Sequence, residues 1–369
     1  MKLNVGRRGV YVLALTLIVI AIVLLCVWRL WLSGDDDPET VDPVATPTAF
    51  YPYVSPAPTG ISAASAVHTG GGGDEVSTVV YYQDNYGYLV PVMCSVPYED
   101  GIAKATLGMM VKSGPNDMQA ARLGLRTVIP ENVSLELDIA DGNARIDIKY
   151  DGKLEFVDAA HESNMIAAIV QTLTEFDTVE TVEFLFNGQR VEKLPYGTEV
   201  SGKFRRGDIN LETESLPTSA SADASALTLY FPGESASVVV PVTRMVYSDA
   251  DIDTAVLEMT RGPMSDALSE AIPEGCGLIG IKVENGVAKV NFTSEFMQIV
   301  NNIDGGRLAL KALAVTCTQF EGVDSVEIYV EGEKWDTGVG ELTAPTFSNI
   351  AGEIEYDYIQ TQASTIFED

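Results

Sequence analysis

The 369-residue sequence has few residues that bind metals or form disulfides: it contains four cysteines and two histidines, His68 and His161. No cysteines form the CxxC pair that is typical of structural zinc sites, and four cysteines in so long a chain do not make a disulfide framework. We therefore expect no metal site and no cofactor. We interpret Cys276 and Cys317 as buried thiols, and a disulfide between them is the alternative.

Basic residues are also scarce, because 23 lysines and arginines stand against 53 acidic residues and give a formal charge of −30. The imbalance grows beyond residue 33, since Lys2, Arg7, Arg8 and Arg29 precede every acidic residue and leave 19 basic against 53 acidic groups. Such a chain lacks the basic stripe that displaces counterions from phosphates. The composition excludes nucleic-acid binding, and it would steer a basic partner surface towards the protein.

Recognisable catalytic motifs are absent as well. The sequence contains no GxSxG elbow, no P-loop and no dinucleotide-binding glycine pattern. Asp249, Asp251 and Asp253 imitate the start of a calcium loop, but threonine stands at the positions that require glycine and glutamate. We interpret these acids as a helix N-terminus. His161 has no recognisable nucleophile to activate, so we predict no catalytic residue.

The first positive feature is a long apolar run, Val10–Trp28, with basic residues before it and acidic residues after it. A run of this length spans a bilayer as a helix, and the flanking charges predict a cytoplasmic N-terminus. We expect residues 1–33 to form a cytoplasmic start and a single-pass cell-membrane anchor over residues 10–31, with the C-terminal domains extracytoplasmic. A cleaved signal peptide and lipidation at Cys26 are the alternatives.

Composition divides the rest of the chain. Residues 34–77 are rich in proline and then in serine and glycine, which predicts a disordered tether. Two globular stretches follow, over residues 78–196 and 226–336. Residues 197–225 between them are interpreted as a linker that lets the two units shift. Residues 337–369 are interpreted as an acidic tail.

The two globular stretches carry the same landmarks in the same order. These pairs are Ser113-Gly114-Pro115 with Arg261-Gly262-Pro263, Ile129-Pro130-Glu131 with Ile272-Pro273-Glu274, Asp141-Gly142 with Asn285-Gly286, and Leu173-Thr174-Glu175-Phe176 with Cys317-Thr318-Gln319-Phe320. The last three pairs are displaced by 143 or 144 residues. Agreement this close indicates an internal duplication.

Each copy predicts the element order β-β-α-β-β-α-β. A helix in copy two is indicated by one apolar face, which consists of Ile252, Ala255, Val256 and Met259, and Ser248 with Asp251 predicts a capping box at its start. A longer helix in copy one has the apolar face Met165, Ile166, Ile169, Val170 and Leu173. The Asn285-Gly286 pair predicts a tight hairpin. The fold class is therefore α+β, with two similar domains whose helices pack on one face of a sheet.

Several motifs are shared with a known family. In copy two they are Leu227–Phe231, Val240–Arg244, Arg261-Gly262-Pro263, Ile272-Pro273, Gly286–Val290 and Thr318-Gln319-Phe320; in copy one they are Val90-Pro91-Val92, Ser113-Gly114-Pro115, Ile129-Pro130 and Gln171–Phe176. Through them the chain resembles a tandem member of the GerM domain family, the sporulation and germination domain. The resemblance implies a membrane-tethered, extracytoplasmic protein of spore-forming Gram-positive bacteria, similar in fold to ring-building modules, with no established catalytic residues.

Together these features predict a non-catalytic envelope protein of sporulation or germination, with partners among envelope or sporulation-complex proteins, or peptidoglycan. A peptidoglycan-modifying hydrolase that uses acidic residues and a small-ligand sensor are the alternatives. Arg244 is the candidate interaction residue, because it is a cation in a largely acidic domain. An internal salt bridge is its alternative role.

Overall fold

The computed structural model describes residues 75–97, 101–213, 224–233, 238–301, 303–338 and 342–343. All of them belong to one compact unit that spans Ala45–Asp369. The predicted anchor over residues 10–31 and residues 34–74 of the predicted tether lie outside the described residues. The tether prediction extended to residue 77, but residues 75–77 belong to the first strand. Within the described part of the chain, no helix combines the length and the apolar character that a membrane crossing requires.

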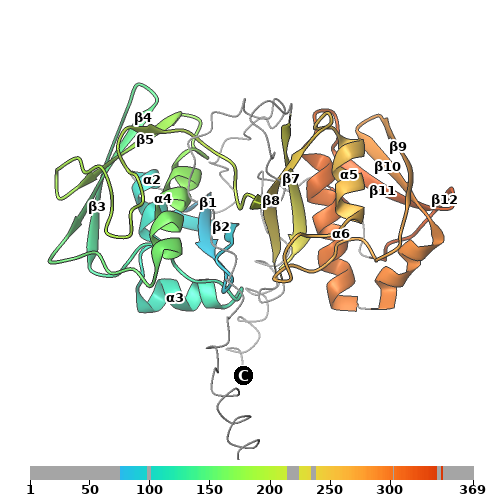
Figure 1. Cartoon of the computed structure of the whole chain (residues 1–369), viewed down its shortest axis with the longest axis horizontal. Helices are drawn as coiled ribbons and strands as arrows, with labels where there is room; N and C mark the ends of the chain where they lie inside the picture. The colour runs from blue at the N-terminus through green and yellow to red at the C-terminus, as the bar shows by residue number, and fades with distance from the viewer. Residues whose placement is uncertain are drawn as a thin grey trace, which may run out of the picture. The chain divides into compact units, whose positions relative to one another are not determined.

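Repeat one consists of a hairpin, helices and a mixed sheet (Figure 1). The hairpin pairs β1 (Glu75–Gln83) with β2 (Leu89–Pro97). The helices are α2 (Ile102–Gly108), α3 (Gly114–Ala121) and α4 (Ala159–Leu173). The sheet has the order β3-β4-β5-β6, formed by β3 (Val133–Ala140), β4 (Asn143–Tyr150), β5 (Thr181–Phe186) and β6 (Lys203–Phe204). β4 and β5 run parallel, so α4 is the crossover between them.

Repeat two has the same plan. Its hairpin pairs β7 (Ser225–Pro232) with β8 (Val239–Val246). Its helices are α5 (Ile252–Thr260), the 3-10 helix η2 (Ser294–Asn301) and α6 (Ile303–Thr318). Its sheet has the order β12-β11-β10-β9, with β9 (Leu278–Glu284), β10 (Val287–Phe292), β11 (Ser325–Val330) and β12 (Glu333–Lys334), and β13 (Leu342–Thr343) also pairs with β11.

The α+β class is confirmed, but the layering differs from the prediction of helices on one face of a sheet. Each hairpin forms a two-stranded sheet of its own, and the long helix contacts both this hairpin and the larger sheet. α4 contacts β1 and β5, and α6 contacts β7 and β11. The cause lies in the helix sequence, because α4 buries eleven of its residues, which surround it rather than forming one stripe. A helix buried on two sides requires cover from two layers.

The predicted helix faces and turns are confirmed. Ala255, Val256 and Met259 are fully buried on α5, as are all five predicted residues of the α4 face, and Ile252 is half-buried against the same core. Asn285 and Gly286 join β9 to β10 with φ angles of 52° and 82°, both in the left-handed region that a type I′ turn requires. A side chain at residue 286 would also collide with Asp324.

The predicted capping box at Ser248 is wrong. Asp251 is the N-cap of α5, and its carboxylate accepts a hydrogen bond from the Thr254 backbone N–H at 2.8 Å. The structure therefore gives the acids at residues 249–253 the helix-start role rather than a calcium-loop role.

A pair of equivalent hydrogen bonds shows how closely the two repeats correspond. In repeat one, the Tyr81 backbone N–H donates to the Thr172 hydroxyl at 3.3 Å. In repeat two, the Tyr230 backbone N–H donates to the Thr316 hydroxyl at 3.1 Å. In both repeats this bond fixes the hairpin on the long helix, and the two threonines are separated by the 144 residues that relate the helix landmarks.

Candidate functional site

The segment between the two repeats is partly folded, which corrects the prediction of a linker over residues 197–225. β6 pairs with β5 in repeat one, and residues 205–212, here called the strap, form hydrogen bonds with both repeats. Sequence reasoning missed the strap because its polar residues resemble those of a loop. Its partners are distant in the sequence, so local composition carries no sign of them.

The strap is attached to repeat one through Arg206. The Arg206 guanidinium donates to the Tyr81 hydroxyl oxygen at 2.7 Å and forms an ion pair with the Glu175 carboxylate. The Tyr81 hydroxyl in turn donates to the same carboxylate at 2.7 Å, and both Tyr81 and Glu175 are buried. This triad joins the strap to β1 and to the residues just beyond α4.

Asn210 connects the strap to both hairpins. Its amide group donates to the Leu89 carbonyl of β2 at 2.8 Å and to the Pro241 carbonyl of β8 at 2.7 Å. Its amide oxygen accepts from the Leu89 backbone N–H at 2.8 Å. Asn210 has a positive φ of 48°, a conformation that asparagine tolerates better than most residues. One side chain therefore bridges the two repeats.

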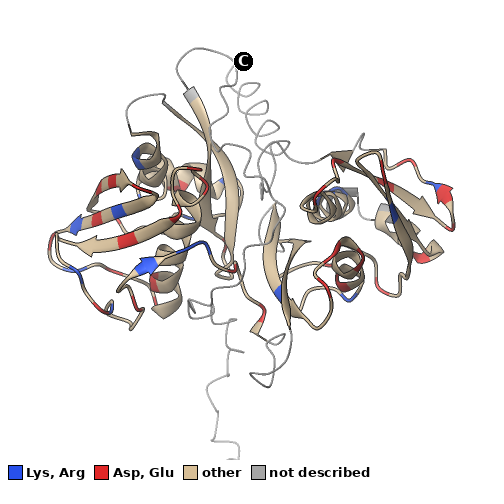
Figure 2. Ribbon diagram, turned by 90° about the horizontal axis from the view of Figure 1, so that it is seen from above, with Lys and Arg blue, Asp and Glu red and all other residues tan. Residues whose placement is uncertain are grey.

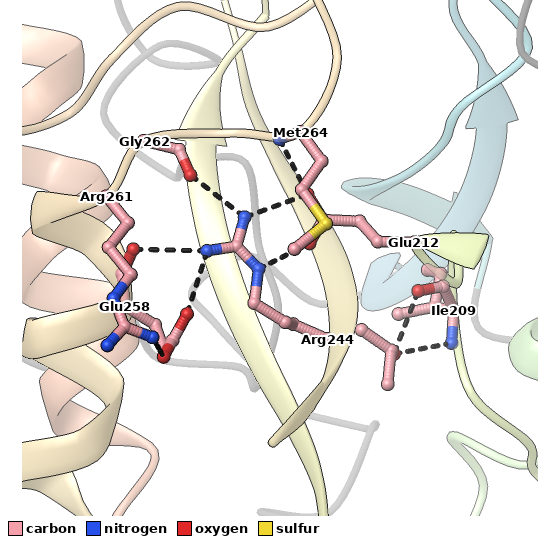
Figure 3. Close-up of polar contacts among 8 residues, drawn as sticks. Ile209, Glu212, Arg244, Glu258, Arg261, Gly262 and Met264 are labelled. Atoms are coloured by element: carbon pink, nitrogen blue, oxygen red, sulfur yellow. Dashed lines mark hydrogen bonds and ion pairs between the residues drawn. The ribbon is translucent and has the colours of Figure 1, made fainter. Parts of the chain in front are cut away.

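Arg244 lies in the centre of the strap's contact with repeat two (Figure 3). It is 1% exposed, and its side chain has five N–H donors. Nε and Nη2 donate to the two Glu212 carboxylate oxygens at 2.6 and 3.1 Å. Nη1 donates to the carboxylate and the carbonyl of Glu258, both at 3.2 Å, and Nη2 also donates to the Gly262 carbonyl at 2.9 Å. All five donors therefore have acceptors.

The two glutamates that bind Arg244 also bind other neighbouring groups. Glu212 accepts a hydrogen bond from the Met264 backbone N–H at 3.1 Å, and Glu258 forms a second ion pair with Arg261. The carbonyls bound by Arg244 belong to the C-terminal end of α5, where the helix dipole favours a cation. Burial disfavours the Arg244 charge, but the bonds to Glu212 and Glu258 outweigh it and raise the pKa of the guanidinium. We call Arg244, Glu212 and Glu258 the clasp.

The clasp decides between the two roles considered for Arg244. A guanidinium that is buried, with every donor used internally, is not accessible to a partner protein. The role as an interaction residue is therefore wrong, and the internal salt bridge is what the structure contains. At the equivalent position, repeat one has the buried Cys94, whose sulfur lies 3.9 Å from the Tyr82 hydroxyl. The clasp is thus particular to repeat two.

The structure shows where Cys94, Cys276, Cys317 and His161 lie. Cys94, Cys276 and Cys317 are buried free thiols, so the alternative of a disulfide between Cys276 and Cys317 is wrong. Burial raises the pKa of Cys94 and of Cys317 to about 12, which keeps both thiols protonated and unreactive. His161 lies in the first turn of α4, where Nδ1 accepts from the Val157 backbone N–H at 3.3 Å. Burial, aided by the charge of Arg126, lowers its pKa.

The carboxylates of the described residues do not gather into a metal site, since no group of three potential ligands occurs among them. The five buried glutamates are instead bound to protein groups: Glu162 to the backbone N–H groups of Tyr196 and Thr198, Glu175 to Arg206, Glu183 to Arg145 and Arg190, and Glu212 and Glu258 to Arg244. Figure 2 shows acidic and basic residues interspersed along the ribbon of both repeats.

Asp84 is a buried carboxylate that sequence reasoning missed. It follows β1 in the hairpin turn, and its Oδ1 accepts from the backbone N–H groups of Tyr86 and Tyr88 at 2.9 and 2.8 Å. Its Oδ2 is buried and has no hydrogen-bond partner, and neither has the Oε1 of the neighbouring Gln83. Burial raises the pKa of Asp84 to about 6, although three backbone hydrogen bonds and the charge of Arg126 lower it in part.

Asp84 is expected to make stability depend on pH. The pKa of Asp84 is about 6 in the folded state and 3.8 without burial. At a pH between these two values, the folded state therefore binds more protons than the unfolded state. The contribution of Asp84 to the free energy of unfolding is complete below about pH 4 and is lost as the pH rises through about 6. We expect the stability of Asp84→Asn relative to the natural protein to increase by up to about 3 kcal/mol from pH 4 to pH 7. Urea unfolding of both proteins from pH 4 to pH 7 measures this change. A stability difference that stays constant across the range would contradict the prediction.

The fold and the clasp define a protein of two α+β repeats joined by an ordered strap. The family model described as "Germane: Sporulation and spore germination" matches residues 79–192 and 228–336. The chain belongs to this family. Spore germination protein GerM of Bacillus subtilis (strain 168) is 26% identical over 275 residues, which cover 70% of this chain and 74% of that protein.

A solved structure shows the same fold. The tandem GerMN domains of the sporulation protein GerM from Bacillus subtilis match with a TM-score of 0.57 at 24% sequence identity, covering 75% of this chain and 100% of that chain. Membership of the family relates this chain to sporulation and germination. The tandem arrangement predicted from the repeated landmarks is thereby confirmed.

Proposed function

We propose that this protein is a non-catalytic assembly factor of the cell envelope in sporulation or germination. In this proposal, residues 10–31 anchor it in the membrane and the two repeats bind envelope proteins outside. The observation that carries the proposal is the strap. Arg206 binds repeat one, Glu212 binds repeat two and Asn210 binds both, so the repeats present their surfaces as one body. Two linked binding surfaces increase the effective concentration of weak contacts.

The chemistry of the buried acids supports a binding role over a hydrolase. A glycoside hydrolase requires two carboxyl groups that face a cleft on either side of the scissile bond. The buried glutamates of the described residues instead bind arginines or backbone N–H groups. Asp84 has the raised pKa of a general acid, but it is fully buried and has no surface that a polysaccharide could reach.

The charge of the chain indicates the kind of partner. Beyond residue 33 the sequence carries 19 basic and 53 acidic residues, so a partner with a basic surface would be steered towards it. Contacts of this kind are screened by salt over a Debye length of about 8 Å at physiological ionic strength. Binding should therefore weaken as salt is added.

A membrane-impermeant, amine-reactive crosslinker applied to sporulating cells tests the proposal. Lys112, Lys193 and Lys282 have side chains that are more than half exposed and offer reactive amines on both repeats. We expect crosslinks to envelope proteins that decrease as salt rises. Added protease should remove the repeats from intact spheroplasts. If neither the crosslinker nor the protease reached the repeats, the proposed export of the repeats would be contradicted. Peptidoglycan cleavage by the purified protein would contradict the non-catalytic role.

A further inference from the structure

The outer face of the sheet in repeat one carries three cations around one buried acid. Arg145 of β4, Glu183 of β5 and Lys203 of β6 lie side by side in the register of the sheet. The residues next to them on β4 and β5 are buried on the side of α4 (Figure 1), so these three side chains point to the opposite, outer face. Arg190, which follows β5, reaches the same Glu183 carboxylate. Arg145, Arg190 and Lys203 are here called the cationic patch.

Glu183 holds the two arginines of the patch in place. Its side chain is 6% exposed, Oε2 accepts from the Nε of Arg145 at 3.4 Å, and Oε1 forms an ion pair with the Nη2 of Arg190. A guanidinium has five N–H donors, and the other donors of these two arginines have no acceptor among the described residues. The side chains of Arg145 and Arg190 are 47% and 69% exposed, and no ion pair joins the exposed Lys203 to another described residue. The patch therefore has donors that are fixed in place and open to solvent.

Repeat two contains the same arrangement of charges. Lys289 of β10 lies beside Glu327 of β11, and Glu327 binds Lys334 at 2.6 Å. These three residues follow Arg145, Glu183 and Arg190 by 144 residues each. Other positions of the outer face differ in charge between the repeats: Asp138, Asp147 and Lys149 correspond to Lys282, Asn291 and Thr293. Both repeats have therefore kept a cation on each side of one glutamate, although exposed ion pairs contribute little to stability.

The two repeats differ in how many of these cations are free. In repeat two, Glu284 binds both Lys282 and Lys289, so every lysine of the outer face has an acid partner. In repeat one, Asp138 lies opposite Arg145, but no ion pair joins them in the described part of the chain. The cationic patch of repeat one can therefore accept a further anionic group, whereas its counterpart in repeat two is neutralised by its own acids.

The carboxylates of a protein segment fit the patch better than a phosphate polymer does. Arginine binds both groups through paired hydrogen bonds. A phosphate polymer, however, would bring a dense row of charges to a chain that carries 53 acidic against 19 basic residues beyond residue 33, and it would be repelled. Acidic side chains bring single charges. β4 and β6 are two strand spacings apart, about 10 Å, and two acids that are two or three residues apart on an extended segment span about 7–10 Å.

We propose that the cationic patch, Arg145, Arg190 and Lys203, is a docking site for an acidic segment of a partner protein. The inference rests on the proposed role in assembly, and it names the surface that a partner contacts. Glu183 is a positioning residue, because it holds the two guanidinium groups and does not itself touch the partner. The acidic surface around the patch attracts cations, so the partner carries basic residues beside its acidic segment.

Protection of individual arginines from phenylglyoxal tests the site in the full chain, purified in detergent solution. Phenylglyoxal modifies accessible guanidinium groups, and mass spectrometry measures the rate of modification at each arginine. The probe is tetraglutamate, and its control is tetraglutamine at the same ionic strength. We expect tetraglutamate, but not tetraglutamine, to slow the modification of Arg145 and Arg190 by at least about threefold. The rate at Arg122, an exposed arginine at the end of α3, should not change.

Two lysine variants separate docking from a structural role. Lys203→Gln removes one cation of the patch and leaves both ion pairs of Glu183 intact, so the variant should fold normally and lose most of the protection. Lys193→Gln is the matched control, because Lys193 is also an exposed lysine of repeat one and its partner Glu199 is exposed too. This control should keep the protection. Urea unfolding should show the same stability for both variants.

Four results would overturn the proposal. Equal slowing at Arg122 would reveal general screening by the probe. Equal protection by inorganic phosphate at the same ionic strength would assign the patch to a small anion. Slower modification of Arg145 and Arg190 at higher protein concentration, without the probe, would assign it to a second copy of the chain. No protection at all would leave the patch as internal ion pairs only, and the role in assembly would still be decided separately by crosslinking in sporulating cells.

Discussion

Replacing Arg244 with methionine is expected to lower the free energy of unfolding by about 3–5 kcal/mol. The substitution removes the cation but leaves the carboxylates of Glu212 and Glu258 in a site that is almost closed to water. An unpaired buried charge costs more than the pair itself contributes. The carbonyls of Glu258 and Gly262 also lose a donor at the C-terminal end of α5. Chemical denaturation of the full chain measures the effect.

Two comparisons separate the charge effect from loss of packing. Arg261→Met removes the other cation bound to Glu258, but the Arg261 side chain is 63% exposed, so we expect a loss below about 1 kcal/mol. Repeat one supplies an apolar version of the clasp, because the aligned positions of Arg244 and Glu258 are Cys94 and Met110, both buried. The triple variant Arg244→Cys, Glu258→Met and Glu212→Gln should therefore recover much of the stability. A loss below about 1 kcal/mol for Arg244→Met alone would show that water reaches the carboxylates.

Local patterns in the sequence predicted the elements well. The Asn285-Gly286 pair predicted a hairpin because few residue pairs adopt two successive left-handed conformations, and the structure has both. The faces of α4 and α5 were predicted from the spacing of apolar residues, which reports directly on burial along a helix. Each of these features depends on residues that are close together in the sequence.

The layering and the clasp depend on distant residues, which explains why the sequence did not predict them. The spacing of apolar residues identified one face of α4, but Asn164, Gln171 and Thr172 are buried too, because their polar groups find partners in the hairpin, in the strap and in Met110, which follows α2. Arg244 was recognised as an unusual cation, yet its main partner is 32 residues earlier in a segment that was interpreted as a linker. No local pattern indicates a pair of this kind.

Ile169→Ala is expected to destabilise both repeats, although Ile169 lies in repeat one. Ile169 is fully buried on α4, and truncating a buried isoleucine to alanine costs about 2–5 kcal/mol. Asn210 and the clasp bond the strap to repeat two, and Arg206 bonds it to repeat one, so unfolding repeat one removes contacts that repeat two uses. Domains coupled in this way unfold in a single transition.

Trp335 provides a probe in repeat two, where it packs against Phe296 with ring centroids 5.7 Å apart. Replacing Trp28 and Trp31 with phenylalanine makes it the only tryptophan of the chain. In this background, Ile169→Ala should lower the denaturation midpoint reported by Trp335 as much as the midpoint reported by circular dichroism. Leu257→Ala is the matched control, because Leu257 lies in repeat two itself but is exposed, so its effect should stay within about 0.5 kcal/mol. A Trp335 midpoint that does not move with Ile169→Ala would mean that the repeats unfold independently and that the strap does not join them into one body.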